Sequence, residues 1–209
     1  LGVIKNPKEA ERLRSSSIKL FKEQSKNGDK EAILKLSRIL AHGIQLDNIN
    51  YQEELNLLKQ ASSYGCREAS FLLGNIYNTG TNINTKILGN LYNTGSKSND
   101  KNHDNVFPII NEKEAFKWFK ISAEQGMIFG MSNVANFLKQ GTGVKQNYRE
   151  AFKWYNIAIL SYKKIVNYKH ADIWELMVIP SNKKHIRELK KTLKSTEIFE
   201  IVKLANEYV

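Results

Sequence analysis

The chain has 209 residues, with 32 Lys and Arg against 21 Asp and Glu and a formal net charge of +11. Hydrophobic residues make up 41% and charged residues 25%, a composition that is typical of a folded protein and excludes a disordered one. The positive charge favours an acidic partner. Because Lys greatly outnumbers Arg, the composition also argues against sequence-specific recognition of nucleic acid.

Cysteine usage and hydropathy narrow the class of protein further. Cys66 is the single cysteine, so an intramolecular disulfide and a zinc site of several cysteines are excluded. No apolar run is long enough to span a membrane, and we expect a soluble chain without an integral membrane segment. The chain begins at Leu1 rather than Met, which favours an exported or periplasmic bacterial protein whose signal peptide has been removed.

Through most of its length the sequence repeats one helical pattern. Each copy starts with two large apolar residues, reaches a turn glycine, and then carries small or apolar residues at every fourth position. This spacing keeps the side chains on one face of a helix, so each copy predicts two antiparallel helices. The large pairs are Leu20-Phe21, Leu57-Leu58, Trp118-Phe119 and Trp154-Tyr155; the ladders are Gly28, Ala32, Leu36, Leu40, Gly43, then Gly65, Ala69, Leu73, Tyr77, Gly80, then Gly126, Gly130, Val134, Leu138, Gly141. Because no copy can bury its apolar face alone, the copies must stack.

The segment 81–110 interrupts this array. It contains Leu88–Gly95, a near copy of the octet Leu73–Gly80, and the spacing from the turn glycine assigns the first octet to the second helix of its unit. The polar stretch that follows the second octet is expected to be a loop, either functional or disordered.

The pattern weakens toward the C-terminus. A fourth copy is predicted at Tyr162, Val166, His170, Trp174 and Met177, with Tyr162 in place of the turn glycine and His170 partly buried in the core. Past Pro180 the apolar spacing predicts two closing helices that cover the end of the array. Their expected N-caps are Ser181 or Asn182 for the first and Ser195 or Thr196 for the second.

These residues resemble the Sel1-like repeat, a relative of the tetratricopeptide repeat. The best copy is Glu114–Val144, and Leu73–Gly80 is similar to the second half of the motif. The resemblance implies an all-α fold, a right-handed α-solenoid of about four stacked antiparallel helix pairs with C-terminal capping helices. We divide the chain into a Sel1-like array at 8–178, with the insert at 81–110, and capping helices at 181–209.

One face of the first helices is rich in lysine. The positions one before and two after the large residue are three apart and share a face. In stacked repeats such positions align, which predicts a basic stripe along the concave face that binds an acidic partner. The alternative is that lysine only solvates these positions. The stripe residues are Lys19, Lys22, Asn56, Lys59, Lys117, Lys120, Lys153 and Asn156.

The sequence offers no catalytic constellation. It contains no nucleophile elbow, zinc-protease motif or phosphate loop, so we predict no catalytic residues and no cofactor. Trp118 and Trp154 are expected in the core because large aromatics at helical spacing usually supply buried area. We predict no metal site, since a real one needs more convergent ligands than the weak candidate group of the insert, Asp100, His103 and Asp104.

The resemblance implies a non-enzymatic protein-interaction module, an adaptor, scaffold or inhibitor. A sharper version is a bacterial immunity protein that neutralises a secreted toxin enzyme such as a lipase. Electrostatic binding to nucleic acid or to an anionic membrane is a second alternative, which the net charge permits. An enzyme whose site is built from the insert and the concave face ranks last.

Overall fold

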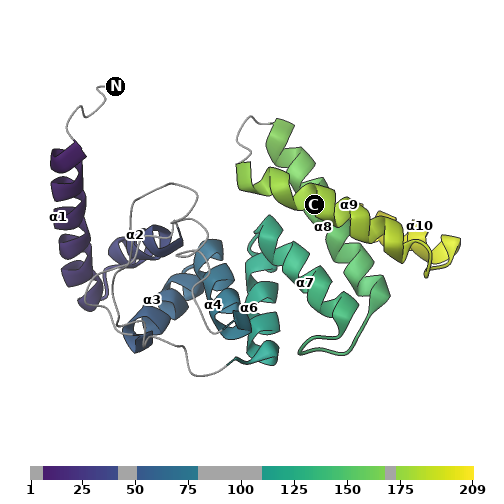
Figure 1. Ribbon diagram of the computed structural model, residues 1–209, viewed down its shortest axis with the longest axis horizontal. Helices are drawn as coiled ribbons and strands as arrows, with labels where there is room; N and C mark the ends of the chain where they lie inside the picture. The colour runs from purple at the N-terminus through teal and green to yellow at the C-terminus, as the bar shows by residue number, and fades with distance from the viewer. Residues whose placement is uncertain (1–6, 42–50, 80–109, 168–172) are drawn as a thin grey trace.

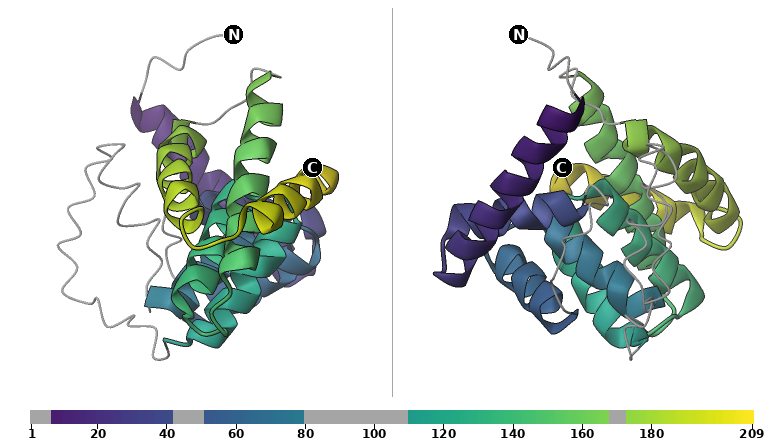
Figure 2. Two further views of the ribbon diagram at one scale, coloured as in Figure 1. Left: turned by 90° about the vertical axis from the view of Figure 1, so that its right-hand side faces the viewer. Right: turned by 60° about the vertical axis from the view of Figure 1, so that its left-hand side comes forward.

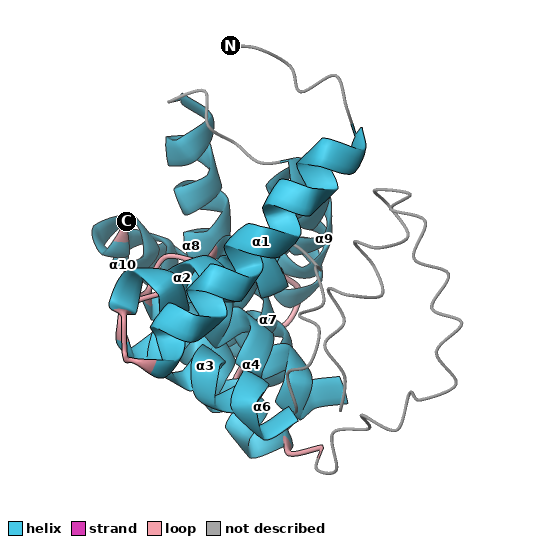
Figure 3. Cartoon of the chain, turned by 90° about the vertical axis from the view of Figure 1, so that its left-hand side faces the viewer, coloured by secondary structure: helices cyan, strands magenta, loops and turns pink. Residues whose placement is uncertain are grey.

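The computed structural model describes residues 7–41, 51–79, 110–167 and 173–209, and every regular element in these ranges is a helix (Figures 1 and 3). The weak candidate group Asp100, His103 and Asp104, the second octet and His170 lie outside the described residues. The helices are α1 (Pro7–Lys26), α2 (Lys30–Ala41), α3 (Tyr51–Ser63), α4 (Arg67–Thr79), α6 (Glu112–Glu124), α7 (Ile128–Gln140), α8 (Tyr148–Asn167), α9 (Ile173–Leu189) and α10 (Ser195–Tyr208).

The helices form a row of antiparallel pairs. α1 packs on α2, α3 on α4, α6 on α7 and α8 on α9, while α4 and α7 each also pack against the first helix of the next pair. Figure 1 places α1 at one end of the row and α8, α9 and α10 at the other, and the right-hand view of Figure 2 also separates α1 from α9. The predicted all-α solenoid is confirmed.

The repeated signals act as expected within each pair. The turn glycines Gly28, Gly65 and Gly126 all have φ between 80° and 86°, the left-handed conformation that ends the first helix. Two asparagines that the sequence analysis missed begin first helices. Asn111 accepts a hydrogen bond from the Glu114 N–H at 3.1 Å, and Asn147 accepts one from the Glu150 N–H at 3.0 Å.

Two clusters of buried side chains meet where α4 packs on α6. One cluster joins α2, α3 and α4, and the other joins α6 through α10. At the junction the Phe119 ring lies 5.8 Å from Phe71 and 5.4 Å from Phe137, measured between ring centroids. Gly74 lets the helices approach, because a Cβ atom there would lie 2.5 Å from the Phe119 ring. The two halves of the array therefore share one continuous packed interior.

The large apolar pairs were expected to be buried, and most of their residues are. Leu57, Leu58, Phe119, Trp154 and Tyr155 are buried, as predicted, and Trp118 is partly buried. Leu20, in contrast, is 51% exposed. It lies on α1, at the end of the row, where no preceding helix among the described residues covers its outer side.

The C-terminal region departs from the predicted boundaries. α8 continues through Tyr162 to Asn167, so no turn occurs at Tyr162. The expected N-caps Ser181 and Asn182 are wrong, because α9 runs through Pro180 from Ile173 to Leu189. Pro180 lies on the exposed side of α9, so the ring does not enter the packed interface. The expected N-caps Ser195 and Thr196 are wrong as well, because the final helix begins at Ser195 with Lys194 as its N-cap.

Candidate functional site

The eight predicted stripe residues all lie on first helices of pairs. α1 carries Lys19 and Lys22, α3 carries Asn56 and Lys59, α6 carries Lys117 and Lys120, and α8 carries Lys153 and Asn156. Five are exposed, and Lys22, Lys153 and Asn156 are partly buried. Second helices lie between consecutive first helices, so the stripe consists of separate groups of two rather than one unbroken line. Partner binding by these residues stays a prediction.

Three stripe lysines on α6 and α8 are paired with glutamates of their own helix. The Nζ to carboxylate distances are 3.6 Å for Lys117 and Glu114, and 3.8 Å for Lys120 and Glu124. The Lys153 and Glu150 pair is closer, at 3.1 Å. The two more exposed pairs, on α6, contribute only about 0.3–0.5 kcal/mol each, so an acidic partner can replace their glutamates at little cost.

A groove lies near Lys120, between the end of α6, the second half of α8 and the end of α10. Its volume is about 430 Å³ and its lining is mostly apolar. Glu124, which pairs with Lys120, belongs to this lining, so the groove adjoins the stripe. The lining residues are Ala123, Glu124, Gly126, Met131, Ser161, Lys164, Tyr208 and Val209.

The groove has a fixed wall and charged edges. The Tyr208 ring packs edge-on against Trp154, with ring centroids 5.5 Å apart, and Lys164 donates a hydrogen bond to the Val209 carbonyl at 2.7 Å. Partial burial, and then the negative charge of Glu124, raise the pKa of Tyr208 above its ordinary value of 10. The phenol therefore stays neutral at physiological pH and can donate a hydrogen bond to a bound group.

A polar cluster joins α7 and α9 away from the groove. Lys139 Nζ lies 2.6 Å from Glu188 Oε2 and 2.9 Å from His185 Nδ1, and His185 stacks on the buried ring of Tyr155 at 5.2 Å. The hydrogen bond from Lys139, followed by that from His185, lowers the pKa of Glu188 from 4.5 to about 2. Next to this cluster the buried Asn182, which is 2% exposed, donates to Ser132 at 2.8 Å.

The lowered pKa of Glu188 predicts a pH-dependent contribution to stability. A carboxylate whose pKa falls on folding stabilises the folded state above its unfolded pKa, and that stabilisation is lost as the pH drops from about 4.5 toward 2. We expect Glu188→Gln to melt below wild type at pH 7, and the gap to narrow at pH 3.5. Thermal denaturation followed by circular dichroism measures both gaps. An equal gap at the two pH values would contradict the assignment.

The described residues contain few groups suited to metal binding or nucleophilic chemistry. In that part of the chain no group of three or more His, Cys, Asp and Glu side chains is placed to hold a metal ion. Cys66 is buried, with its Sγ 3.4 Å from Ser37 Oγ and 3.5 Å from a Glu68 carboxylate oxygen. None of the described helices has both the length and the apolar composition that crossing a membrane requires.

Comparisons with known proteins identify the repeat. The Sel1 repeat family matches residues 88–127 and 128–161, the first of which starts in the second octet, outside the described residues. The chain carries two Sel1 repeats. A Sel1 repeat protein from Oxalobacter formigenes has a similar fold, with a TM-score of 0.50 and 20% identity over 80% of this chain and 95% of its own.

A second solved structure is similar over a longer stretch but superimposes less well. It is a protective antigen of uropathogenic Escherichia coli with an SLR fold, 18% identical, with a TM-score of 0.27, and it matches 91% of this chain and 48% of its own. No curated protein matches the chain. Sel1 repeat proteins are in general protein-interaction modules and are typically not enzymes.

Proposed function

We propose that the chain binds a partner protein across α6, α8 and α10, with an apolar group of the partner in the groove and acidic groups on the stripe lysines. The observation that carries this proposal is the contiguity of the two features. Glu124 lines the groove and pairs with Lys120 of the stripe. Interfaces of this composition, an apolar anchor pocket bordered by charged side chains, are typical of specific protein partners.

The charged part of the proposal predicts the effect of reversing three lysines. We expect the triple variant Lys117→Glu, Lys120→Glu and Lys153→Glu to lose partner capture from the native cell, because each new glutamate repels an acidic partner. The matched control reverses three exposed lysines of α9 and the turn after it, Lys183, Lys184 and Lys191, with the same change in net charge. Capture that survives the stripe variant, or that both variants abolish equally, would contradict the proposal.

The apolar part predicts the effect of filling the groove. Ser161 lines the groove on α8, and its replacement by Trp places a large ring where the partner's anchor would lie. We expect Ser161→Trp to weaken binding of the captured partner at least about tenfold while the melting temperature stays near that of wild type, because the groove is open to solvent. Calorimetric titration with the captured partner measures the affinity, and an unchanged Kd excludes the groove.

The identity of the captured protein decides between an adaptor and an inhibitor. If the partner is a secreted toxin enzyme such as a lipase, its activity is expected to fall when this chain is added in stoichiometric amount. An adaptor or scaffold leaves the partner's activity unchanged and instead brings a second protein into the complex.

A further inference from the structure

A dense group of exposed positive charges lies on α9 and the turn that follows it. Six cationic side chains fall between residues 183 and 194, and all six are exposed: Lys183, Lys184, Arg187, Lys190, Lys191 and Lys194. We call this set the α9 basic face. The same helix buries Ile179, Asn182, Ile186 and Leu189 on its other side, so α9 is amphipathic with a basic outer surface.

The nearby carboxylates form their closest ion pairs with cations outside the α9 basic face. Glu188 is paired with Lys139 of α7. Arg149 of α8 pairs with both Glu197 and Glu200 of α10. Within the described part of the chain, none of the five Lys and Arg side chains between residues 183 and 191 forms an ion pair with a carboxylate.

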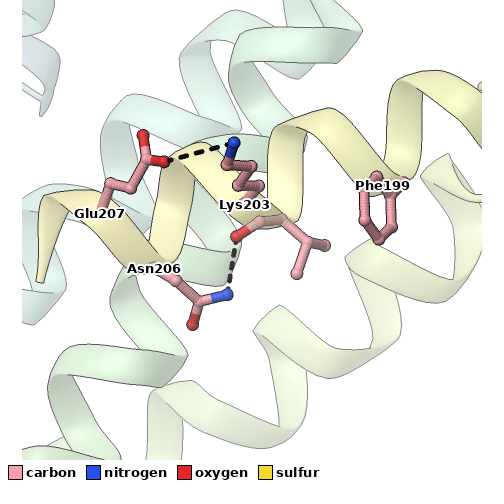
Figure 4. Close-up of a pocket in the computed structure, with 5 residues that line it drawn as sticks. Phe199, Lys203, Asn206 and Glu207 are labelled. Carbon is pink, nitrogen blue, oxygen red and sulfur yellow. Dashed lines mark hydrogen bonds and ion pairs between the residues drawn. The ribbon is translucent and has the colours of Figure 1, made fainter.

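An exposed aromatic ring follows the α9 basic face in the sequence. Phe199 is 75% exposed and lies in the second turn of α10, roughly 8 Å along the helix from Lys194. The polar side chains beside it are satisfied within α10: Asn206 donates to the Val202 carbonyl at 2.8 Å, and Lys203 pairs with Glu207 at 4.0 Å. Figure 4 shows the Phe199 ring projecting from α10 with none of the other drawn side chains packed against it.

We propose that the α9 basic face attaches the protein to an anionic membrane surface, with Phe199 entering the interface. Five of the six cations are Lys, a strongly hydrated point charge that suits a diffuse plane of lipid headgroups better than the paired hydrogen bonds of phosphate recognition in nucleic acid. The partly exposed Val202 beside Phe199 makes this site aliphatic as well as aromatic, which favours acyl chains over stacked bases. The site shares α10 with the partner groove but includes none of the residues that line the groove.

Vesicle co-sedimentation of the full chain tests this assignment. Wild type is expected to bind vesicles of phosphatidylcholine that contain about one third phosphatidylglycerol, and not to bind vesicles of pure phosphatidylcholine. Added salt is expected to release the bound protein. Replacing Lys183, Lys184 and Lys191 by Gln should lower the partition coefficient roughly a hundredfold, since each lysine near an anionic surface contributes about fivefold. The matched control replaces Lys117, Lys120 and Lys153 by Gln and should bind nearly as wild type.

Three results would overturn the proposal. An equal loss in the two triple variants would assign the binding to net charge alone. Absence of vesicle binding, with polynucleotide bound instead, would assign the α9 basic face to nucleic acid. Phe199→Ser binding as tightly as wild type would exclude the ring from the bilayer, whereas we expect about a tenfold loss. Because these variants leave the groove intact, partner capture by the α9 variant remains as a separate readout of the proposed function.

Discussion

Phe119→Ala is expected to lower the free energy of unfolding by about 3–5 kcal/mol. The ring is 1% exposed and packs between Phe71 of α4 and Phe137 of α7, so its removal leaves a cavity that neither neighbour can fill without moving a helix. The cavity falls at the junction of the two buried clusters, which weakens the packing of α4 on α6. Urea denaturation followed by circular dichroism measures the loss.

The matched control is the same substitution at a phenylalanine that packs on little. Phe199 is 75% exposed, and Phe199→Ala is expected to change the free energy of unfolding by no more than about 0.5 kcal/mol. A Phe119→Ala variant that unfolds at the same urea concentration as Phe199→Ala would show that the junction does not hold the two halves together.

Gly143→Ala is the second substitution with a large expected effect, about 3 kcal/mol or more of lost stability. Gly143 has φ +63°, and a Cβ atom there would lie 2.4 Å from both the carbonyl carbon and the carbonyl oxygen of Glu112. These are backbone atoms at the start of α6, so the clash cannot be relieved by turning a side chain. Either the loop between α7 and α8 must move away or the first turn of α6 must open.

Gly126→Ala is the control that carries the backbone strain of a positive φ without the steric clash found at Gly143. Gly126 has φ +86°, but nothing lies within 4 Å of a Cβ atom built there, so only the left-handed conformation carries a cost, about 1–2 kcal/mol. Thermal denaturation of the two variants is therefore expected to rank Gly143→Ala well below Gly126→Ala. Equal melting temperatures would mean that the close approach to Glu112 is not maintained in solution.

Local spacing predicted the parts of the fold that depend on local geometry. The turn glycines, the large apolar pairs and the stacked helix pairs follow from helical periodicity and from the need to bury an apolar face. The predicted burial of Leu20 was wrong, because burial also requires a neighbouring helix and α1 stands at the end of the row. Pro180 was expected to break the helix, but the packing of Ile179, Asn182 and Ile186 on its buried side outweighs the hydrogen bond that proline removes.

The candidate site was predictable only in part. The stripe lysines could be found because they recur in each unit, and their glutamate partners are visible at spacings of three and four. The groove could not be found from the sequence, because Glu124, Lys164 and Tyr208 come from three helices and no short-range pattern specifies how these helices pack. The α9 basic face was readable as a charge run, but only the ion pairs of Glu188 and Glu197 show that it stays uncompensated.

The attachment of α1 determines how much its lysines can add to partner affinity. α1 packs mainly against α2 and leaves Leu13 and Leu20 in contact with water, so its amides should exchange with deuterium sooner than those of α4 and α6. A partner that binds Lys19 and Lys22 must restrict the local opening of α1. The conformational entropy that α1 loses on binding offsets the electrostatic attraction to these two lysines. The lysines of α6 and α8 stand on firmly packed helices and carry no such penalty, so evolution of a new specificity would act most effectively there.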